Sequence, residues 1–198
     1  MMLPLLFGNT AYTLIFWIAF AIWVVPEWLG AFFQRAAGNA QIHDRGSYVV
    51  LMLGMWSGIA LDFSLPLLLP AATITWHRTL LFGVGIALML VGVALRWYAI
   101  RVLGQYFTRD VAVRPDQPVV QSGPYRYIRH PAYSGTLLTM LGLGLTVTNW
   151  TSLVAIMVCT LLGYAYRVSV EEQALREKIG QPYVDYMRRT RRFIPFVF

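Results

Sequence analysis

Charged residues are scarce in this chain. Asp, Glu, Lys and Arg together make up 13% of it, about half of the roughly 25% that soluble domains carry. Acidic residues are scarcer than basic ones, with nine Asp and Glu against 16 Lys and Arg. Hydrophobic residues make up 58% of the chain. This balance excludes an ordinary soluble domain and predicts one integral membrane domain. Membrane topology explains the net charge of +7 better than nucleic acid does, so we expect no nucleic-acid partner.

Several common signals are also missing. The only cysteine, Cys159, lies in an apolar run, so no internal disulfide can form. The three histidines are far apart and lack the paired spacing of metal ligands, so we predict no metal site. No G-x-G-x-x-G follows a strand, which argues against a dinucleotide-binding domain. The N-terminus lacks a basic region and a small-residue cleavage site, so we expect its first apolar segment to be a retained span.

Long hydrophobic runs are abundant, and their lengths can be compared with the about 20 residues that a spanning helix needs. Five segments qualify or nearly qualify: Leu5–Val25, Ser47–Leu69, Thr79–Ile100, Tyr133–Thr148 and Trp150–Val168. The last two almost touch and should form a tight antiparallel hairpin. The fourth is short and rich in glycine, which permits close helix approach in lipid.

These spans define the predicted fold class, an all-α integral membrane protein with five transmembrane helices in a single domain. Residues 1–100 would hold spans one to three, and 101–132 a cytosolic loop. Residues 133–168 would form the hairpin of spans four and five, and 169–198 the short cytosolic C-terminal helices.

Basic residues indicate the orientation. With five spans, 15 of the 16 Lys and Arg fall on one side and only Arg78 on the other, which predicts a cytoplasmic C-terminus. The basic run 188–192 lies beside Phe193, Phe196 and Phe198, a composition typical of contact with anionic lipid headgroups.

The polar segments between and after the spans contain turn signals. Val111–Val113 and Val119–Val120 flank a proline-containing segment, which predicts a short hairpin or paired loop. Residues 169–179 should be helical, Gly180 should cap that helix, and Pro182–Arg189 should form another.

Polar residues gather at the ends of the predicted spans, and each has a structural alternative to a functional role. His130, next to Pro131, could be a capping or interfacial group. Arg167 could pair with Glu171 one turn later or present a guanidinium fork to a carboxylate. Glu172 could complete a capping box with Ser169, and it points about 100° away from Glu171.

Asp62 lies inside the second span. An acid at membrane depth is a functional candidate by default. A helix-terminal or snorkelling role is the alternative, because Pro66 follows closely.

Three ordered motifs resemble a known family. The segment Gly123–Tyr133 is similar to the G-x-Y-x-x-x-R-H-P-x-Y signature of isoprenylcysteine carboxyl methyltransferases and their bacterial and archaeal relatives. Arg167–Glu172 resembles the R-x-x-x-E-E that ends the family's last span, and Gly180–Tyr186 with Phe193–Pro195 resembles its closing segment. The resemblance covers roughly Gly104 to Pro195 and leaves the first two spans unmatched.

The resemblance implies an S-adenosylmethionine-dependent membrane methyltransferase whose cofactor pocket lies between the cytosolic loop and the C-terminal helices. The expected cofactor-binding residues are Gln105, Val120, Gly123, Tyr125, Arg129, His130, Tyr133 and Glu172. Arg167 would hold the acceptor, oriented by Glu171. A carboxylate acceptor is already ionised near neutral pH, so it would need no general base.

The acceptor expected from this resemblance is a lipophilic small molecule or a prenylated protein, most readily a carboxylate, with a thiol or amine left open. Phospholipid amine methylation is the first alternative function. A non-catalytic scaffold or small transporter is another, although a transporter would place its polar groups near the bilayer midplane. A sterol-reductase-like enzyme is a further one, for which the chain is short. The sequence predicts no oligomeric state.

Overall fold

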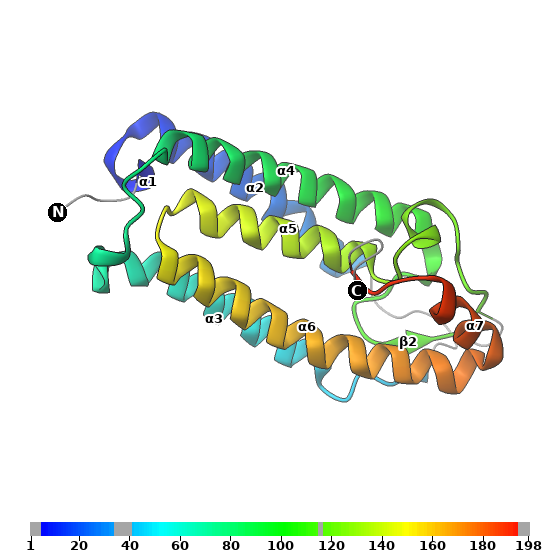
Figure 1. Ribbon diagram of the computed structural model, residues 1–198. Helices are drawn as coiled ribbons and strands as arrows, with labels where there is room; N and C mark the ends of the chain where they lie inside the picture. Colours follow the sequence, from blue (N-terminus) through cyan, green and yellow to red (C-terminus); the bar gives the residue numbers. More distant parts are fainter. Residues whose placement is uncertain (1–4, 34–40, 115–116, 194–198) are drawn as a thin grey trace.

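The computed structural model describes residues 5–33, 41–114 and 117–193 as a bundle of long helices (Figure 1). The helices are α1 (Leu5–Gly8), α2 (Thr10–Phe33), α3 (Ser47–Leu68), α4 (Arg78–Leu103), α5 (Pro131–Thr146), α6 (Trp150–Ile179) and α7 (Gln181–Arg189), with the 3-10 turns η1 (Pro70–Ala72), η2 (Gly104–Tyr106) and η3 (Gly123–Arg126). The all-helical prediction is confirmed.

Four helices are long and apolar enough to cross a membrane, counted over the described residues: Thr10–Gly30, Ser47–Leu68, Arg78–Tyr106 and Trp150–Ile179. The chain is therefore an integral membrane protein. The predicted span Tyr133–Thr148 is α5, which has only 16 residues and is about 24 Å long, shorter than the roughly 30 Å of hydrocarbon in a bilayer. The count of five spans is not confirmed, although α5 lies between α4 and α6 along the bundle (Figure 1).

Glycines bring α4 and α5 close together. A Cβ placed on Gly92 would lie 2.5 Å from the carbonyl oxygen of Gly135, and one on Gly135 would lie 2.6 Å from that of Gly92. The same reciprocal contact recurs seven residues along each helix, between Gly85 and Gly142. Small residues permit such backbone contact in lipid, where packing and not the hydrophobic effect holds helices together.

The predicted hairpin of α5 and α6 is confirmed. Asn149 is the N-cap of α6, and its side-chain oxygen accepts a hydrogen bond from the Ser152 amide at 3.2 Å. Its side-chain nitrogen donates to the Leu69 carbonyl oxygen at 3.2 Å, which links the hairpin to the end of α3. Along the bundle α6 packs on α3, where a Cβ on Gly54 would lie 2.7 Å from the Cys159 carbonyl oxygen.

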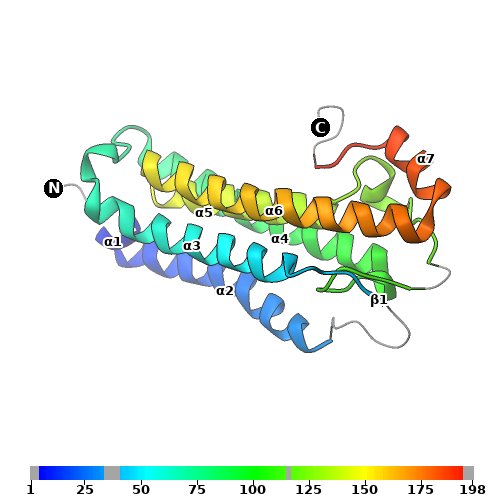
Figure 2. The same cartoon turned by 90° about the horizontal axis from the view of Figure 1, so that it is seen from below.

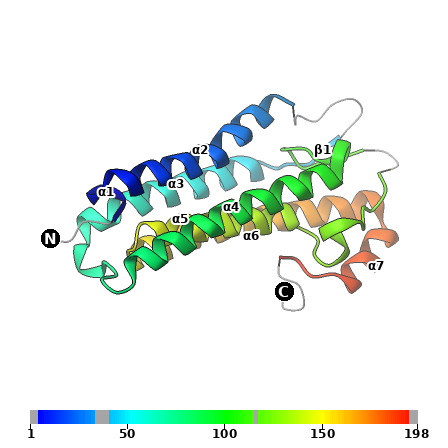
Figure 3. The same ribbon diagram turned by 90° about the horizontal axis from the view of Figure 1, so that it is seen from above.

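Helix α2 is the peripheral member of the bundle. Its C-terminal part diverges from α3, as Figures 2 and 3 show from opposite sides. Pro26 lies inside this part of the helix, and an internal proline removes one hydrogen bond and bends a helix. The divergence separates α2 from α3 at the end of the bundle that carries the loops.

One prediction about the loops is wrong, and one structural alternative is excluded. The strand β2 (Ala112–Val113) pairs antiparallel with β1 (Gln41–Ile42), and not with Val119–Val120; residues 115–116 of the predicted hairpin lie outside the described residues. Helix α6 is continuous through Ser169, so no helix begins there. The Ser169 hydroxyl donates to the Tyr166 carbonyl oxygen at 2.7 Å, and the capping box is therefore absent.

Downstream, the predicted end of α6 is confirmed. Gly180 follows its last residue with φ 74°, and a left-handed φ is where glycine is favoured over other residues. The next helix, α7, begins one residue before the predicted Pro182 and ends at Arg189 as predicted.

Asp62 is completely buried in α3. Neither carboxylate oxygen has a hydrogen-bond partner among the described residues, while its backbone oxygen accepts a bond from the Ser152 hydroxyl at 2.9 Å. The snorkelling interpretation is therefore wrong, because the side chain reaches neither water nor a helix end.

The contact between α4 and α5 can be tested by substitution of Gly92. We expect Gly92→Leu to lower the thermal midpoint of the detergent-solubilised protein by several degrees, because overpacking costs typically about 1–3 kcal/mol. Gly83→Leu is the matched control, since no atom lies within 4 Å of a Cβ at Gly83 on the same helix. Equal midpoints for the two variants, measured by nanoscale fluorimetry, would contradict the close approach.

Candidate functional site

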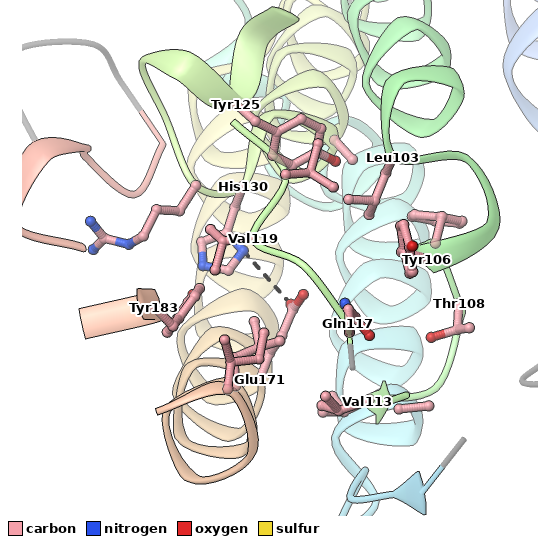
Figure 4. A pocket seen from close by; sticks show the side chains of 18 of the residues that line it. Leu103, Tyr106, Thr108, Val113, Gln117, Val119, Tyr125, His130, Glu171 and Tyr183 are labelled. Atoms are coloured by element: carbon pink, nitrogen blue, oxygen red, sulfur yellow. Dashed lines mark ion pairs between the residues drawn. The ribbon is translucent and has the colours of Figure 1, made fainter. Parts of the chain in front are cut away.

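The histidine of the R-H-P segment and the glutamate pair meet at one end of the bundle. The Nε2 atom of His130 lies 3.3 Å from Oε1 of Glu172, and its Nδ1 atom lies 3.7 Å from Oε2 of Glu171. Figure 4 marks the second of these contacts with a dashed line. The sequence prediction that these groups share one face of the membrane domain is therefore confirmed.

The Glu172 carboxylate is the centre of a buried ion cluster. Its side chain is 1% exposed, and it accepts hydrogen bonds from Arg129 Nε at 2.9 Å and from an Arg192 terminal nitrogen at 2.9 Å. Arg129 also donates to the carbonyl oxygens of Met187 and Thr190. A buried carboxylate needs such pairing, because an uncompensated charge is expensive to bury.

The chain after α7 is paired with the R-H-P segment by backbone hydrogen bonds. The amide of Arg129 donates to the Arg191 carbonyl oxygen at 2.7 Å, and that of His130 donates to the Arg192 carbonyl oxygen at 3.0 Å. The Ser134 hydroxyl donates to the Phe193 carbonyl oxygen at 2.6 Å. The beginning of α5 is thus fixed by residues about 60 positions later in the chain.

A first pocket opens beside this cluster and encloses about 840 Å³ of atom-free space, part of it open to solvent. Figure 4 shows Tyr106 and Tyr125 on one side of it and His130, Glu171 and Tyr183 on the other. Aliphatic side chains of the loop, among them Val113 and Val119, complete the wall. The pocket therefore combines aromatic surfaces with the carboxylates of Asp110 and Glu171 and the imidazole of His130.

Most of the predicted site residues lie at this pocket, but three do not line it. Its lining includes Val120, Tyr125, Arg129, His130, Tyr133, Arg167 and Glu171. Glu172 lies behind the wall, bonded to Arg129, His130 and Arg192. Gln105 accepts a hydrogen bond from Arg114 at 3.3 Å. Gly123, with φ 56°, begins the turn η3 and positions Tyr125.

Arg167 is only 3% exposed, and its guanidinium is held by protein atoms. One terminal nitrogen donates to Asp44 and to the Ser47 hydroxyl, the other donates to the Arg109 carbonyl oxygen, and Nε donates to the Tyr133 hydroxyl at 3.3 Å. These four acceptors occupy at most four of the five N–H groups of an arginine. At least one N–H therefore has no partner among the described residues.

Glu171 does not pair directly with Arg167, which differs from the expected arrangement. It accepts a hydrogen bond at 2.7 Å from the Tyr133 hydroxyl, which in turn accepts the bond from Arg167. The Tyr133 ring also stacks on that of His130 with centroids 5.3 Å apart. Tyr133 therefore connects the acidic residue, the histidine and the arginine.

A second cavity, which also has Arg167 in its wall, encloses about 1090 Å³, again partly open. Its wall comes from α2, α3, α4, α5, α6 and the loop after α4, and it includes Trp23, Trp28, Trp56, Met52 and Met55. Trp28 and Trp56 are more than half exposed, so the cavity reaches the surface that would face lipid. Four residues belong to the walls of both cavities, namely Phe107, Thr108, Tyr133 and Arg167.

Two further arginines border the second cavity together with one carboxylate. Glu27 of α2 forms a two-point ion pair with Arg96 of α4. Arg109 lies 3.7 Å from the same carboxylate and donates to the Tyr48 hydroxyl at 3.2 Å. Since Arg167 is the third cation, this wall carries more positive than negative charge and suits an anionic group.

Sequence reasoning missed several partners at the site. Asp44 and Arg109 come from loops far from Arg167 in the sequence, and no local spacing indicates that they meet. Tyr183 and Tyr186 do carry a signal, because residues three apart share a helix face. Burial raises the pKa of Tyr186 to about 12, so its hydroxyl stays protonated and donates to the Tyr125 carbonyl oxygen at 2.7 Å.

Fold and site together define a helical membrane protein with a polar pocket at one end of its bundle. Residues 85–177 match the profile of the isoprenylcysteine carboxyl methyltransferase (ICMT) family. The family resemblance seen in the sequence motifs is therefore confirmed for this part of the chain.

Individual proteins with names that match this family are also similar to the chain in sequence. The chain is 33% identical over 115 residues to protein-S-isoprenylcysteine O-methyltransferase B of Arabidopsis thaliana, and this match covers 57% of the chain and 58% of the relative. It is 29% identical over 119 residues to the Tribolium castaneum protein-S-isoprenylcysteine O-methyltransferase, covering 59% of the chain and 42% of that protein. The chain thus spans less than two thirds of the length of these relatives.

A solved structure is also similar. The structure of the eukaryotic intramembrane Ras methyltransferase ICMT matches 79% of the chain and 55% of that protein, with a TM-score of 0.59 and 25% sequence identity. The match extends beyond the residues that the family profile covers.

The Glu172 ion cluster yields a prediction about stability. Arg129→Ala should lower the thermal midpoint markedly, because breaking a buried pair costs about 3–5 kcal/mol, offset in part by Arg192 and His130. Arg188→Ala is the control, since the Arg188 side chain is 72% exposed and its 3.6 Å pair with Asp185 lies at the surface. A midpoint for Arg129→Ala as high as that of the control would show that the cluster contributes little.

Proposed function

We propose that this protein transfers a methyl group from S-adenosylmethionine to a lipophilic carboxylate at the membrane surface. The observation that carries the proposal is the pair of cavities that share Tyr133 and Arg167 in their walls. One cavity is bounded by loops and the C-terminal helices, and the other by membrane helices. A water-soluble donor and a lipid-borne acceptor could therefore meet at one arginine and one tyrosine.

The first pocket suits the cofactor chemically. Aromatic faces attract cations such as a sulfonium, and Tyr106, Tyr125 and Tyr183 border this space. The Glu171 carboxylate and the His130 imidazole lie in the same wall, where a carboxylate suits an ammonium group. The family resemblance supports the same cofactor.

Arg167 would hold the acceptor. Its protein-bound N–H groups fix the guanidinium, and a remaining N–H is left for one oxygen of an incoming carboxylate. Contact with one oxygen leaves the other free to attack. This arrangement would bind the acceptor without neutralising its nucleophile.

The chemistry that the bound cofactor supplies is an electrophilic methyl group on a sulfonium. The residues of this chain then have to position and desolvate the acceptor, which can provide much of the rate of such a transfer. The carboxylate arrives ionised, so neither Glu171 nor His130 has to take a proton from it. Tyr133, tied to Glu171 and Arg167, would separate the two cavities and keep their contents aligned.

The topology is part of the proposal. The end of the bundle that carries the pocket would face the cytosol, which supplies the cofactor, and α5 would be the fifth membrane helix. The acceptor would enter the second cavity sideways between α2 and α3, where α2 diverges. The basic residues of α7 and the following segment would contact anionic headgroups; Phe196 and Phe198 of that predicted cluster lie outside the described residues.

Cofactor binding is the first test. We expect detergent-solubilised protein to bind S-adenosylhomocysteine in titration calorimetry, and His130→Ala to weaken that binding by about tenfold or more, since His130 both lines the pocket and holds the ion cluster. Tyr127→Ala is the matched control, because Tyr127 is 54% exposed two residues before the pair Arg129 and His130. Equal affinities for both variants would reject the assigned pocket.

The acceptor site is the second test, with N-acetyl-S-farnesylcysteine as the probe and radiolabelled S-adenosylmethionine as the donor. We expect Arg167→Ala to lower kcat/KM by about 100-fold or more and to leave the affinity for S-adenosylhomocysteine within about threefold. A parallel loss of both would make Arg167 a structural residue. Methylation of a phospholipid amine in place of the carboxylate probe would contradict the proposed acceptor class.

A further inference from the structure

Asp44 is the least expected of the residues bonded to Arg167. It lies in the loop before α3, outside the segment that matches the family profile. Its Oδ1 atom accepts bonds from an Arg167 terminal nitrogen and, at 2.9 Å, from the Ser47 hydroxyl. That hydroxyl also accepts a bond from the same arginine nitrogen at 2.9 Å. Asp44 and Ser47 therefore both accept hydrogen bonds from the same terminal nitrogen of the guanidinium.

Asp44 is itself fixed by the backbone. Its Oδ2 atom accepts a hydrogen bond from the Tyr48 amide at 3.1 Å, and its Oδ1 atom accepts one from the Val111 amide at 3.3 Å. Burial alone would raise the pKa of the Asp44 carboxyl. The hydrogen bonds from Tyr48 and Ser47 and the charge of Arg167 together outweigh this effect, so the pKa lies below its ordinary value. The group is thus a fixed carboxylate near neutral pH.

Asp44 holds Arg167 in place without being placed to bind a ligand itself. Asp44 belongs to the lining of neither cavity, whereas Arg167 belongs to both. Since it lines neither cavity, it does not occupy the position that an acceptor carboxylate would take there. What it can control is the direction in which the remaining N–H of Arg167 points.

From this geometry we infer that Asp44 is a positioning residue for acceptor methylation, which acts through Arg167 by fixing the orientation of its guanidinium. The inference rests on the proposed function. It adds a residue from a part of the chain in which neither the motifs nor the family profile places any role. A displacement of about 1 Å in a positioned group can cost about 100-fold in rate, so a loosely held Arg167 would be a poor clamp.

The test uses the 198-residue chain in detergent, with the farnesylcysteine probe and S-adenosylmethionine. Asp44→Asn keeps a hydrogen-bonding side chain of the same size and removes the charge, while Asp44→Glu keeps the charge. We expect Asp44→Asn to lower kcat/KM for the probe by about 10- to 100-fold, with the affinity for S-adenosylhomocysteine within about twofold. Asp44→Glu should recover part of the loss. Asp185→Asn, at an exposed surface pair, is the control and should match the wild type.

A double-substitution cycle separates positioning from general destabilisation. Lysine lacks the planar fork, so in an Arg167→Lys background Asp44 has no guanidinium to orient, and Asp44→Asn should cost no more than about threefold further. The same 10- to 100-fold factor in both backgrounds would mean that Asp44 acts on the whole fold, and this result would overturn the inference.

Different experimental results would overturn the inference and the proposed function. Wild-type protein that methylates the probe, together with an Asp44→Asn variant of equal kcat/KM, would overturn the inference alone. Wild-type protein that neither binds S-adenosylhomocysteine nor methylates the probe would overturn the proposed function and the inference with it.

Discussion

The rest of the site depends on the ion pairs that the buried Glu172 carboxylate forms. Its side chain is 1% exposed, and the cations around it compensate the cost of removing its charge from water. Arg129 brings the R-H-P segment to it, and Arg192 brings the chain after α7. One charge thus holds together the start of α5, the end of α6 and the C-terminal segment, and these elements form a wall of the first pocket.

A continuous set of polar contacts extends from this cluster to Arg167 and from there to the loops before α3 and after α4. His130 contacts both glutamates, Glu171 accepts from Tyr133, and Tyr133 accepts from Arg167. Arg167 then reaches Asp44 and the backbone of Arg109. The two cavities are therefore separated by side chains whose positions depend on one another.

The sequence predicted those parts of the structure whose causes are local. Hydrophobic run length located α2, α3, α4 and α6, and the glycine after α6 marked its end. Of the motif Gly123–Tyr133, the residues Tyr125, Arg129, His130 and Tyr133 line the first pocket. What the sequence could not give was pairing between distant segments: β1 with β2, Asp44 with Arg167, and Arg192 with Glu172. A serine followed by a glutamate three residues later resembles a cap in any sequence, and only the continuity of α6 through Ser169 excludes it.

The shortness of α5 also has a consequence for solvation. Its second turn packs against α4 through Gly135 and Gly92, and from Gly92 α4 continues to Leu103, about 16 Å further. The R-H-P segment, at the start of α5, is therefore recessed relative to the end of α4. Lifting a lipid tail into water costs about 0.8 kcal/mol for each methylene group. Under the proposed function, such a recess would spare a lipid acceptor that expense, since its tail would stay in hydrocarbon while its polar end met the aqueous side.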